Sequence, residues 1–160
     1  MELHELQATA SLVISASPED LYSFIADMPR VGEVSPVCTG GTWETESRGL
    51  GATFIGSNTR GERTWQARRR VVVAEPSAAF AWDNVGEATA PLDAGASANA
   101  RWTYTFEPVD GGTLVTESWE VLPGSRVLEA LDNPRVASLP GMTQGGMEET
   151  LENLKKVFES

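Results

Sequence analysis

Apolar residues near the end of the chain recur at three- and four-residue intervals, which is the period of an amphipathic helix. We predict this helix over residues 143–160, with an apolar stripe formed by Met147, Thr150, Leu151, Leu154, Val157 and Phe158. The Leu-Pro-Gly segment at 139–141 predicts a break before it, and Thr143 is the expected N-cap. A stripe of this length needs a partner surface, which we expect to be a sheet.

The N-terminal part predicts a strand followed by a helix. Residues 6–15 alternate in polarity, with Leu12 and Ile14 on one face. Residues 17–20 read Ser-Pro-Glu-Asp, which supplies an N-cap and a proline in the first helical turn. The helix that follows should be stopped by Pro29, and residues 30–36 should hold one more short helix. Its predicted buried stripe is Leu21, Phe24, Ile25 and Met28.

Beyond residue 40 the pattern changes to period two, which is typical of strands separated by turns rich in Gly, Pro, Asp and Ser. Six strands are predicted there, at residues 42–46, 52–60, 63–75, 78–85, 101–109 and 113–122. The small and polar residues 86–99 predict a mobile loop. The proline-containing residues 122–141 predict a lid-like connection to the terminal helix.

These elements predict an α+β fold in one domain over residues 1–160: a curved antiparallel seven-stranded sheet that grips the long C-terminal helix. Such a sheet must curl around the helix, and the space between them becomes either core or cavity.

Charge and composition narrow the classes of partner. The 160-residue chain has a formal net charge of -11 and one cysteine. The acidity argues against nucleic acid or an anionic membrane as partner. A single cysteine favours a reducing compartment, and no window is long and apolar enough for a membrane span, so we expect a cytoplasmic protein. A homodimer is compatible with the sequence.

The supply of catalytic side chains is also limited. With only His4 and Cys38, neither a Cys/His zinc site nor a Ser-His-Asp or Cys-His arrangement is easily assembled, so we expect no metal and no cofactor. Cys38 is interpreted as a buried small hydrophobe. Residues 49–51, Gly-Leu-Gly, lack the third glycine and the helix of a dinucleotide-binding motif.

Alternation assigns a face to each strand if the aromatic side is taken as inward. Residues 65, 67, 69, 71 and 73 then share the inner face of one strand, as do 115, 117, 119 and 121 on another. This face is either a packed aromatic core or the wall of a ligand pocket. The candidate ligand-binding residues are Phe54, Asn58, Trp65, Arg69, Trp82, Trp102, Tyr104, Glu117, Trp119, Met142, Gly146 and Met147.

Two glycines near the start of the terminal helix, Gly145 and Gly146, each cost roughly 1 kcal/mol of helix stability relative to alanine. Their presence suggests close approach of a bulky group, either a ligand or Trp119 from the sheet. In the predicted strand at 63–75, Arg68 and Arg70 should point away from the inner face, toward solvent and neighbouring acids.

Arg69 and Glu117 fall on the inner faces of their strands, where an isolated charge is very costly. We therefore expect them to pair with each other or to face a water-filled cavity. The alternative is a bulge that shifts the register and turns one of them to solvent.

Four segments resemble the START-like helix-grip (SRPBCC) superfamily, specifically its polyketide cyclase/dehydrase and lipid-transport members. They are residues 15–30, 63–82, 101–121 and the terminal helix. The resemblance covers essentially the whole chain and implies a deep, mostly apolar pocket between sheet and helix that accepts a small hydrophobic molecule. It does not name the molecule.

Three functional hypotheses follow. The first is binding or transport of a small hydrophobic, lipid- or polyketide-like molecule. The second is an aromatic polyketide cyclase or dehydratase, in which Arg69, Glu117, Tyr104 or Asn58 polarises a carbonyl or moves a proton. The third is a protein-interaction module. The sequence leaves open whether any reaction is catalysed.

Overall fold

The computed structural model describes residues 1–86 and 98–160. Its strands form one antiparallel seven-stranded sheet in the order β1-β7-β6-β5-β4-β3-β2. The bounds are β1 Gln7–Ile14, β2 Cys38–Trp43, β3 Thr53–Arg60, β4 Arg63–Glu75, β5 Ala79–Val85, β6 Ala98–Val109 and β7 Gly112–Val121. The predicted seven-stranded fold is therefore confirmed.

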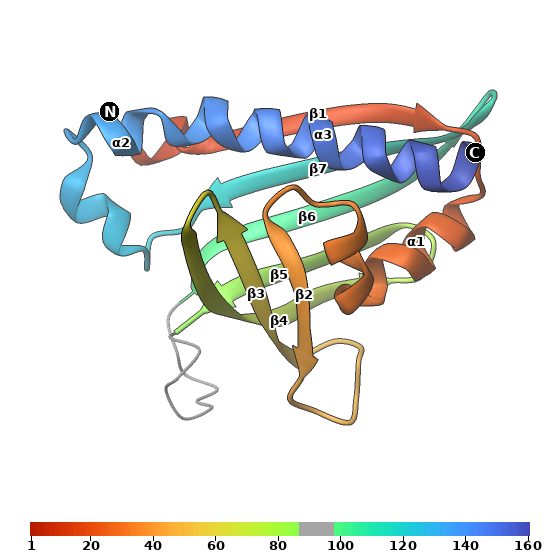
Figure 1. Cartoon of the computed structure of the whole chain (residues 1–160), viewed down its shortest axis with the longest axis horizontal. Coiled ribbons are helices and arrows are strands. Elements are labelled where there is room, and N and C mark those ends of the chain that lie inside the picture. The colour runs from red at the N-terminus through yellow and green to blue at the C-terminus, as the bar shows by residue number, and fades with distance from the viewer. Residues whose placement is uncertain (87–97) are drawn as a thin grey trace.

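The helices occupy one side of this sheet. β1 and β7 lie behind α3 in Figure 1, and the sheet turns through β6, β5 and β4 until β3 and β2 stand in front. The helices are η1 Leu3–Glu5, α1 Pro18–Ala26, η2 Met28–Glu33, η3 Arg126–Ala130, α2 Pro134–Ala137 and α3 Leu139–Glu159. In the described part of the chain, none of them is both long and apolar enough to cross a bilayer.

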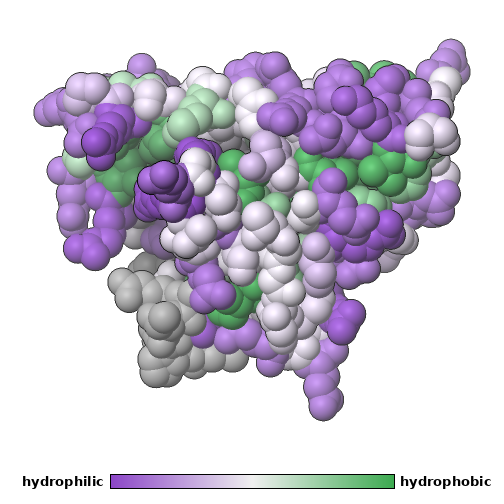
Figure 2. Space-filling view, in the orientation of Figure 1, coloured by the Kyte–Doolittle hydropathy of each residue, from purple (hydrophilic) through white to green (hydrophobic). Residues whose placement is uncertain are grey.

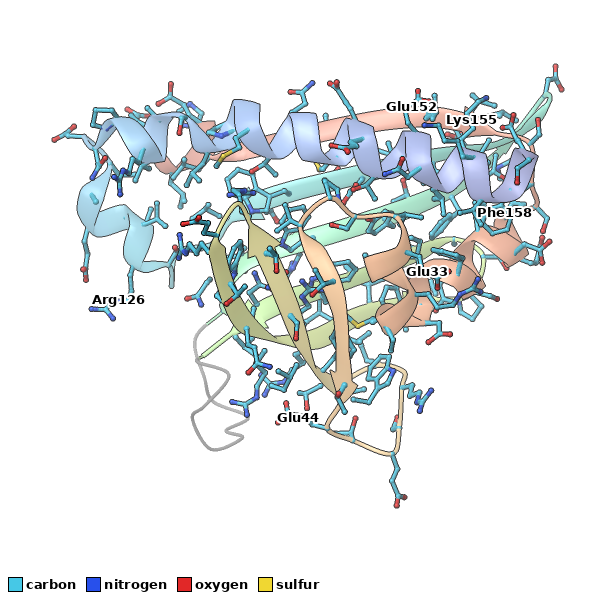
Figure 3. All side chains as sticks on the ribbon, in the orientation of Figure 1. Glu33, Glu44, Arg126, Glu152, Lys155 and Phe158 are labelled. Carbon is cyan, nitrogen blue, oxygen red and sulfur yellow. The ribbon has the colours of Figure 1, made fainter. Side chains whose placement is uncertain are left out.

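The helix α3 packs on the inner face of the sheet through one side only. Met147, Leu151 and Leu154 are buried in the main core, as the sequence pattern predicts. Figure 3 shows Glu152 and Lys155 on the outer side of the helix and Phe158 on the side facing α1, where its ring meets that of Phe24 at 5.7 Å. Hydrophobic atoms are visible beneath the hydrophilic outer surface of α3 in Figure 2.

The helix α3 begins four residues earlier than predicted. Leu139, Pro140 and Gly141 form its first turn, and the residue at the N-cap is Ser138 instead of Thr143. Proline in a first turn is favourable because its missing N–H would have no intrahelical partner there. The prediction treated Pro140 as a break when it is a start.

The first helix starts as predicted, because the Ser17 hydroxyl accepts a hydrogen bond from the Asp20 amide at 3.1 Å. It ends at Ala26, before the expected Pro29. Pro29 lies instead within the 3₁₀ helix η2, which covers most of the second short helix expected at 30–36. Met28, Leu21, Phe24 and Ile25 are all buried, as predicted.

The strand β2 differs from its prediction because two glycines lie inside it. It runs over Cys38–Trp43 instead of 42–46, with a register shift between Cys38 and Gly40. Gly40 and Gly41 have φ of 125° and 150°, which other residues rarely adopt. A Cβ on Gly41 would also collide with the Ile55 carbonyl oxygen. The glycines therefore permit this bulged edge strand.

A second bulge corrects the face assignment of β4. Val71 pairs with Trp82, but the register shifts so that Ala74, and not Val73, pairs with the inward-facing Phe80. Because a bulge inserts one extra residue, it reverses the alternation beyond it. The inner-face assignment of Val73 was therefore wrong.

The expected solvent exposure of Arg68 was also wrong. Its side chain is buried, and its Nε and Nη2 donate to the two carboxylate oxygens of Glu44 at 2.8 and 3.0 Å. This bidentate pairing raises the pKa of Arg68 and lowers the pKa of Glu44. Glu44 is the acidic neighbour that was predicted, and its two hydrogen bonds offset the cost of burying the Arg68 charge.

Two predicted connections have different outcomes. Most of the expected loop at 86–99 lies outside the described residues, and Ala98 and Asn99 already belong to β6. The connection at 122–141 contains η3 and α2, and its Val127, Leu128 and Leu131 pack against the core. None of the described residues of this connection lines the cavity between the sheet and α3.

Candidate functional site

A cavity of about 170 Å³ lies between the inner face of the sheet, η2 with the segment after it, and the first half of α3. Its wall runs from fully buried side chains such as Tyr104 to exposed ones such as Met142, so it reaches the surface. A cavity of about 150 Å³ in another protein binds benzene, so this space suits roughly one aromatic ring. Its wall comprises Val31, Ser35, Pro36, Val37, Cys38, Asn58, Arg60, Trp65, Ala67, Arg69, Trp82, Asn84, Trp102, Tyr104, Glu117, Met142, Thr143, Gly146, Met147 and Thr150.

Ten of the twelve candidate residues lie in this wall; the other two, Phe54 and Trp119, lie in the core beside it. The Phe54 ring is fully buried and packs edge-on against Trp43 at 5.4 Å. The Trp119 ring packs against Trp102 at 6.4 Å, and Trp102 lines the cavity in its place. Alternation finds the correct face in both cases, but it does not tell which inward residues reach the cavity.

Ten wall residues were not among the candidates: Val31, Ser35, Pro36, Val37, Cys38, Arg60, Ala67, Asn84, Thr143 and Thr150. Residues 31–38 come from η2 and the segment leading into β2, where no periodic pattern marks a face. Asn84 and Ala67 lie on strands, and a signal existed for both. Ala67 is in the inward register, and Asn84 is the direct partner of Arg69 across β4 and β5. Polar residues opposite a predicted inward arginine are therefore useful candidates.

Arg69 reaches the cavity because the neighbouring strand leaves space for it. A Cβ on Gly56 of β3 would lie 2.9 Å from the Arg69 guanidinium carbon. The guanidinium also lies over the Trp82 ring, 5.4 Å from its centroid. Its Nη2 donates to Asn58 Oδ1 at 3.2 Å, and Nη1 approaches Cys38 Sγ at 3.7 Å. Glycine at position 56 thus permits this arrangement.

Glu117 on β7 lies opposite Tyr104 on β6, and the tyrosine hydroxyl donates to its Oε1 at 2.7 Å. Burial raises the pKa of Glu117 to about 8, although the Tyr104 hydrogen bond opposes that shift. The carboxyl group is therefore mainly protonated at neutral pH. Burial, followed by the nearby Glu117, raises the pKa of Tyr104, which stays a hydrogen-bond donor.

Arg69 and Glu117 both face the cavity, as expected for inward positions. They do not form an ion pair with each other within the part of the chain that the structure describes. Of the two arrangements expected for these charges, the cavity is the one present. The alternative of a register-shifting bulge does not apply to Arg69, because the bulge in β4 comes after Val71.

Unpartnered polar atoms concentrate around this cavity. Six buried side-chain nitrogen or oxygen atoms of the described residues lack a hydrogen-bond partner, and four belong to the cavity wall. A buried polar atom without a partner costs roughly 1–3 kcal/mol. A ligand or water that hydrogen-bonds to these atoms would remove that cost. The four are Arg69 Nε, Trp82 Nε1, Asn84 Oδ1 and Glu117 Oε2.

The paired glycines of α3 differ in role. A Cβ on Gly146 would point toward Pro36 in the cavity wall, with its nearest atom at 4.0 Å, whereas one on Gly145 would meet nothing within 4 Å. Trp119 approaches neither glycine, so that interpretation of the pair was wrong. Gly146 leaves room in the cavity, and Gly145 faces open space.

A second recess of about 580 Å³ lies at the far side of β7, near the start of β1. Its wall is mostly polar, with Thr9, Arg101, Ser118 and Gln144 beside Trp119, and it contains none of the unpartnered buried atoms. No group of three or more His, Cys, Asp or Glu side chains suited to a metal occurs within residues 1–86 and 98–160. The smaller cavity is therefore the candidate site.

Comparison with known proteins gives the chain a family context. The family model described as "Polyketide cyclase / dehydrase and lipid transport" matches residues 5–159. A polyketide-cyclase-like protein from Corynebacterium glutamicum is 34% identical, with a TM-score of 0.57, and the match covers 96% of this chain and 91% of that one. None of the curated proteins compared with the chain matched it.

More distant structures share the fold. A protein from Chromobacterium violaceum is 16% identical, with a TM-score of 0.68 over 96% of this chain and 98% of its own. A di-domain ARO/CYC protein of the steffimycin biosynthetic pathway is 14% identical, with a TM-score of 0.70 over 98% of this chain and 52% of its own. At such identities the similarity concerns the fold alone.

Proposed function

Because the chain belongs to the polyketide cyclase/dehydrase and lipid transport family, we propose that its cavity binds a small hydrophobic molecule bearing a hydroxyl or carbonyl group. The observation that carries this proposal is the set of four unpartnered polar atoms that belong to wall residues, in a wall that also presents aromatic and aliphatic side chains. Arg69 Nε and Trp82 Nε1 would donate to the ligand oxygen. Asn84 Oδ1 would accept a hydrogen bond from a ligand hydroxyl.

The protonated Glu117 adds a further donor. With Oε1 accepting from Tyr104, a protonated Glu117 would carry its proton on Oε2, the oxygen that has no partner. A neutral carboxyl at this position favours a neutral ligand oxygen over an anionic one buried in the same place. The size of the cavity supports one ring or one end of a longer molecule, and not a whole lipid.

We also propose, from composition alone, that the protein acts in the cytoplasm and without nucleic acid. The single cysteine and the net charge of -11 support these two points.

The binding proposal is tested with 4-ethylphenol and ethylbenzene, which differ by one hydroxyl group. By isothermal titration, Arg69→Met should weaken 4-ethylphenol about tenfold, because a hydrogen bond to a charged donor is lost. Ethylbenzene binding should change little, since it never used that donor. Equal weakening of both compounds would remove the assigned role of Arg69.

Two variants on α3 test whether the compounds bind in this cavity. Gly146→Trp should fill the cavity and abolish binding of both compounds, whereas Gly145→Trp adds the same side chain toward open space and should preserve it. Binding that survives Gly146→Trp would show that the compounds bind elsewhere.

A second candidate function is an aromatase/cyclase-type reaction. Two di-domain neighbours with 14% and 16% identity are described as ARO/CYC proteins of biosynthetic pathways. The observation that favours it here is that the protonated Glu117, Tyr104 and Arg69 face one cavity, where they can polarise a carbonyl and supply a proton. Closure of a linear diketone into a ring with loss of water, dependent on Glu117, would distinguish this function from binding alone.

A further inference from the structure

The turn between β3 and β4 places two arginines at the entrance of the cavity. Arg60 and Arg63 are direct partners across the two strands, and Asn58 and Trp65 are the partners two residues further in. Residues at alternate positions, and their direct partners, point to the same face of a sheet. Arg60, Asn58 and Trp65 line the cavity. The side chains of Arg60 and Arg63 therefore share the face that carries the site.

Both guanidinium groups gather around the Trp65 ring. The guanidinium carbon of Arg63 lies 5.0 Å from the ring centroid and that of Arg60 lies 6.0 Å from it. A tryptophan ring attracts cations at such distances, which orients both arginines without neutralising them. Two positive charges are therefore held together beside the cavity.

This arrangement is electrostatically unfavourable in the free protein. Like charges directly opposite each other on neighbouring strands are destabilising. The chain has 23 acidic residues against 12 lysines and arginines, yet neither arginine forms an ion pair with a carboxylate of the described residues. Glu62, in the turn between the two arginines, forms no ion pair with either of them. An anion at this position would relieve the repulsion.

We propose that Arg60 and Arg63 form an anion subsite at the cavity entrance, and that the ligand is an amphiphile with a carboxylate or phosphate group. Its apolar body enters the cavity, while its anionic group stays outside between the two guanidinium groups. This inference rests on the proposed binding function and specifies the class of ligand. It assigns opposite preferences to the two ends of the site: a neutral oxygen inside and an anion at the entrance.

The contribution of this subsite should be modest and sensitive to salt. Both arginines are exposed, and an exposed ion pair contributes about 0.2–1 kcal/mol. Two such contacts correspond to an affinity gain of about two- to thirtyfold. The net charge of -11 repels anions at long range. The gain therefore comes from short-range contact and should decrease as salt screens it.

The test compares 3-(4-hydroxyphenyl)propionate with its methyl ester. Both carry the phenol that the interior should bind, but only the first carries an anion at the other end. The anion should bind more tightly than the ester at low salt, and the preference should shrink in high salt. The double variant Arg60→Gln/Arg63→Gln should reduce the preference to about onefold while leaving ester affinity nearly unchanged.

A charge-matched control is Arg48→Gln/Arg126→Gln, which removes two exposed arginines that do not line the cavity (Arg126 is labelled in Figure 3). It should retain the preference for the anion. If the ester binds and Arg69→Met weakens it, but the anion has no advantage, the subsite is refuted and the binding function stands. An advantage that survives in the Arg60/Arg63 variant also refutes the subsite. If neither compound binds, both proposals fail.

Discussion

Single residues decide the chemistry of the cavity. Gly56 lacks the side chain that would collide with the Arg69 guanidinium, and Tyr104 fixes one oxygen of Glu117 while the other stays available. Arg69 and Glu117 are not positioned by an ion pair with each other. Arg69 donates to Asn58, and Glu117 accepts from Tyr104. The polar end of the site is therefore a set of individually positioned donors and acceptors beside aromatic and aliphatic side chains of the same wall.

Glu117 should make the stability of the protein depend on pH. Its pKa is raised from 4.5 to about 8 in the folded state, so its contribution is fully present below pH 4.5 and is lost as pH rises through about 8. In that window the unfolding free energy should fall by about 1.4 kcal/mol per pH unit because of this group. Urea unfolding of the wild type and of Glu117→Gln across the window measures the difference.

Glu117→Gln should lack this contribution to the pH dependence of the unfolding free energy, because an amide does not ionise. Glu120→Gln changes an exposed carboxyl three residues away on the same strand and should retain it. Parallel pH profiles for the wild type and Glu117→Gln would show that Glu117 ionises normally in the folded protein.

Among the elements, α3 closes the sheet and supplies one wall of the cavity. Its buried residues Met147, Leu151 and Leu154 belong to the main core. Leu151→Ala should lower the unfolding free energy by about 2–5 kcal/mol, since it removes a fully buried leucine. Val157→Ala removes a side chain that is 44% exposed on the same helix and should cost less than about 0.5 kcal/mol. Similar losses for both variants would contradict the packing described for α3.

At the same scale, the elements show what the sequence could predict. The strands β4, β5 and β7 lie within a residue of their predicted bounds, because clear alternation is bounded by turn residues. The errors come from local backbone features that a polarity pattern does not encode. The predicted strand at 42–46 left out Gly40 and Gly41, which form part of a bulged strand, and Pro140 was read as a break although it lies in the first turn of α3.

The site was predictable to a similar extent. Period two places Arg69, Tyr104 and Glu117 on the correct face, so most of the cavity wall follows from the sequence. The bond from Tyr104 to Glu117 and the separate partners of Arg69 depend on three-dimensional packing between strands that are distant in the chain. Residues 31–38 contribute to the cavity wall from an irregular segment, in which no hydrophobic periodicity predicts which side chains point inward.

For the whole molecule, one curved sheet closed by one helix leaves a small cavity on an acidic protein. Its interior holds Arg69 and the protonated Glu117, and two further arginines lie at its entrance. The charge distribution and the cavity size act together: they favour a short amphiphile that enters with its apolar end first. Large lipids and polycyclic molecules exceed the space of about 170 Å³ unless part of the molecule remains outside.

The central claim is that the interior polar atoms bind the oxygen of a small hydrophobic ligand, and a crystal structure of the protein with 4-ethylphenol tests it most directly. We expect the ring between Trp82 and Met147, with its hydroxyl oxygen within hydrogen-bonding distance of Arg69 Nε or Glu117 Oε2. A phenol bound in the second recess beside Trp119, or one whose hydroxyl points to the cavity entrance, would contradict it.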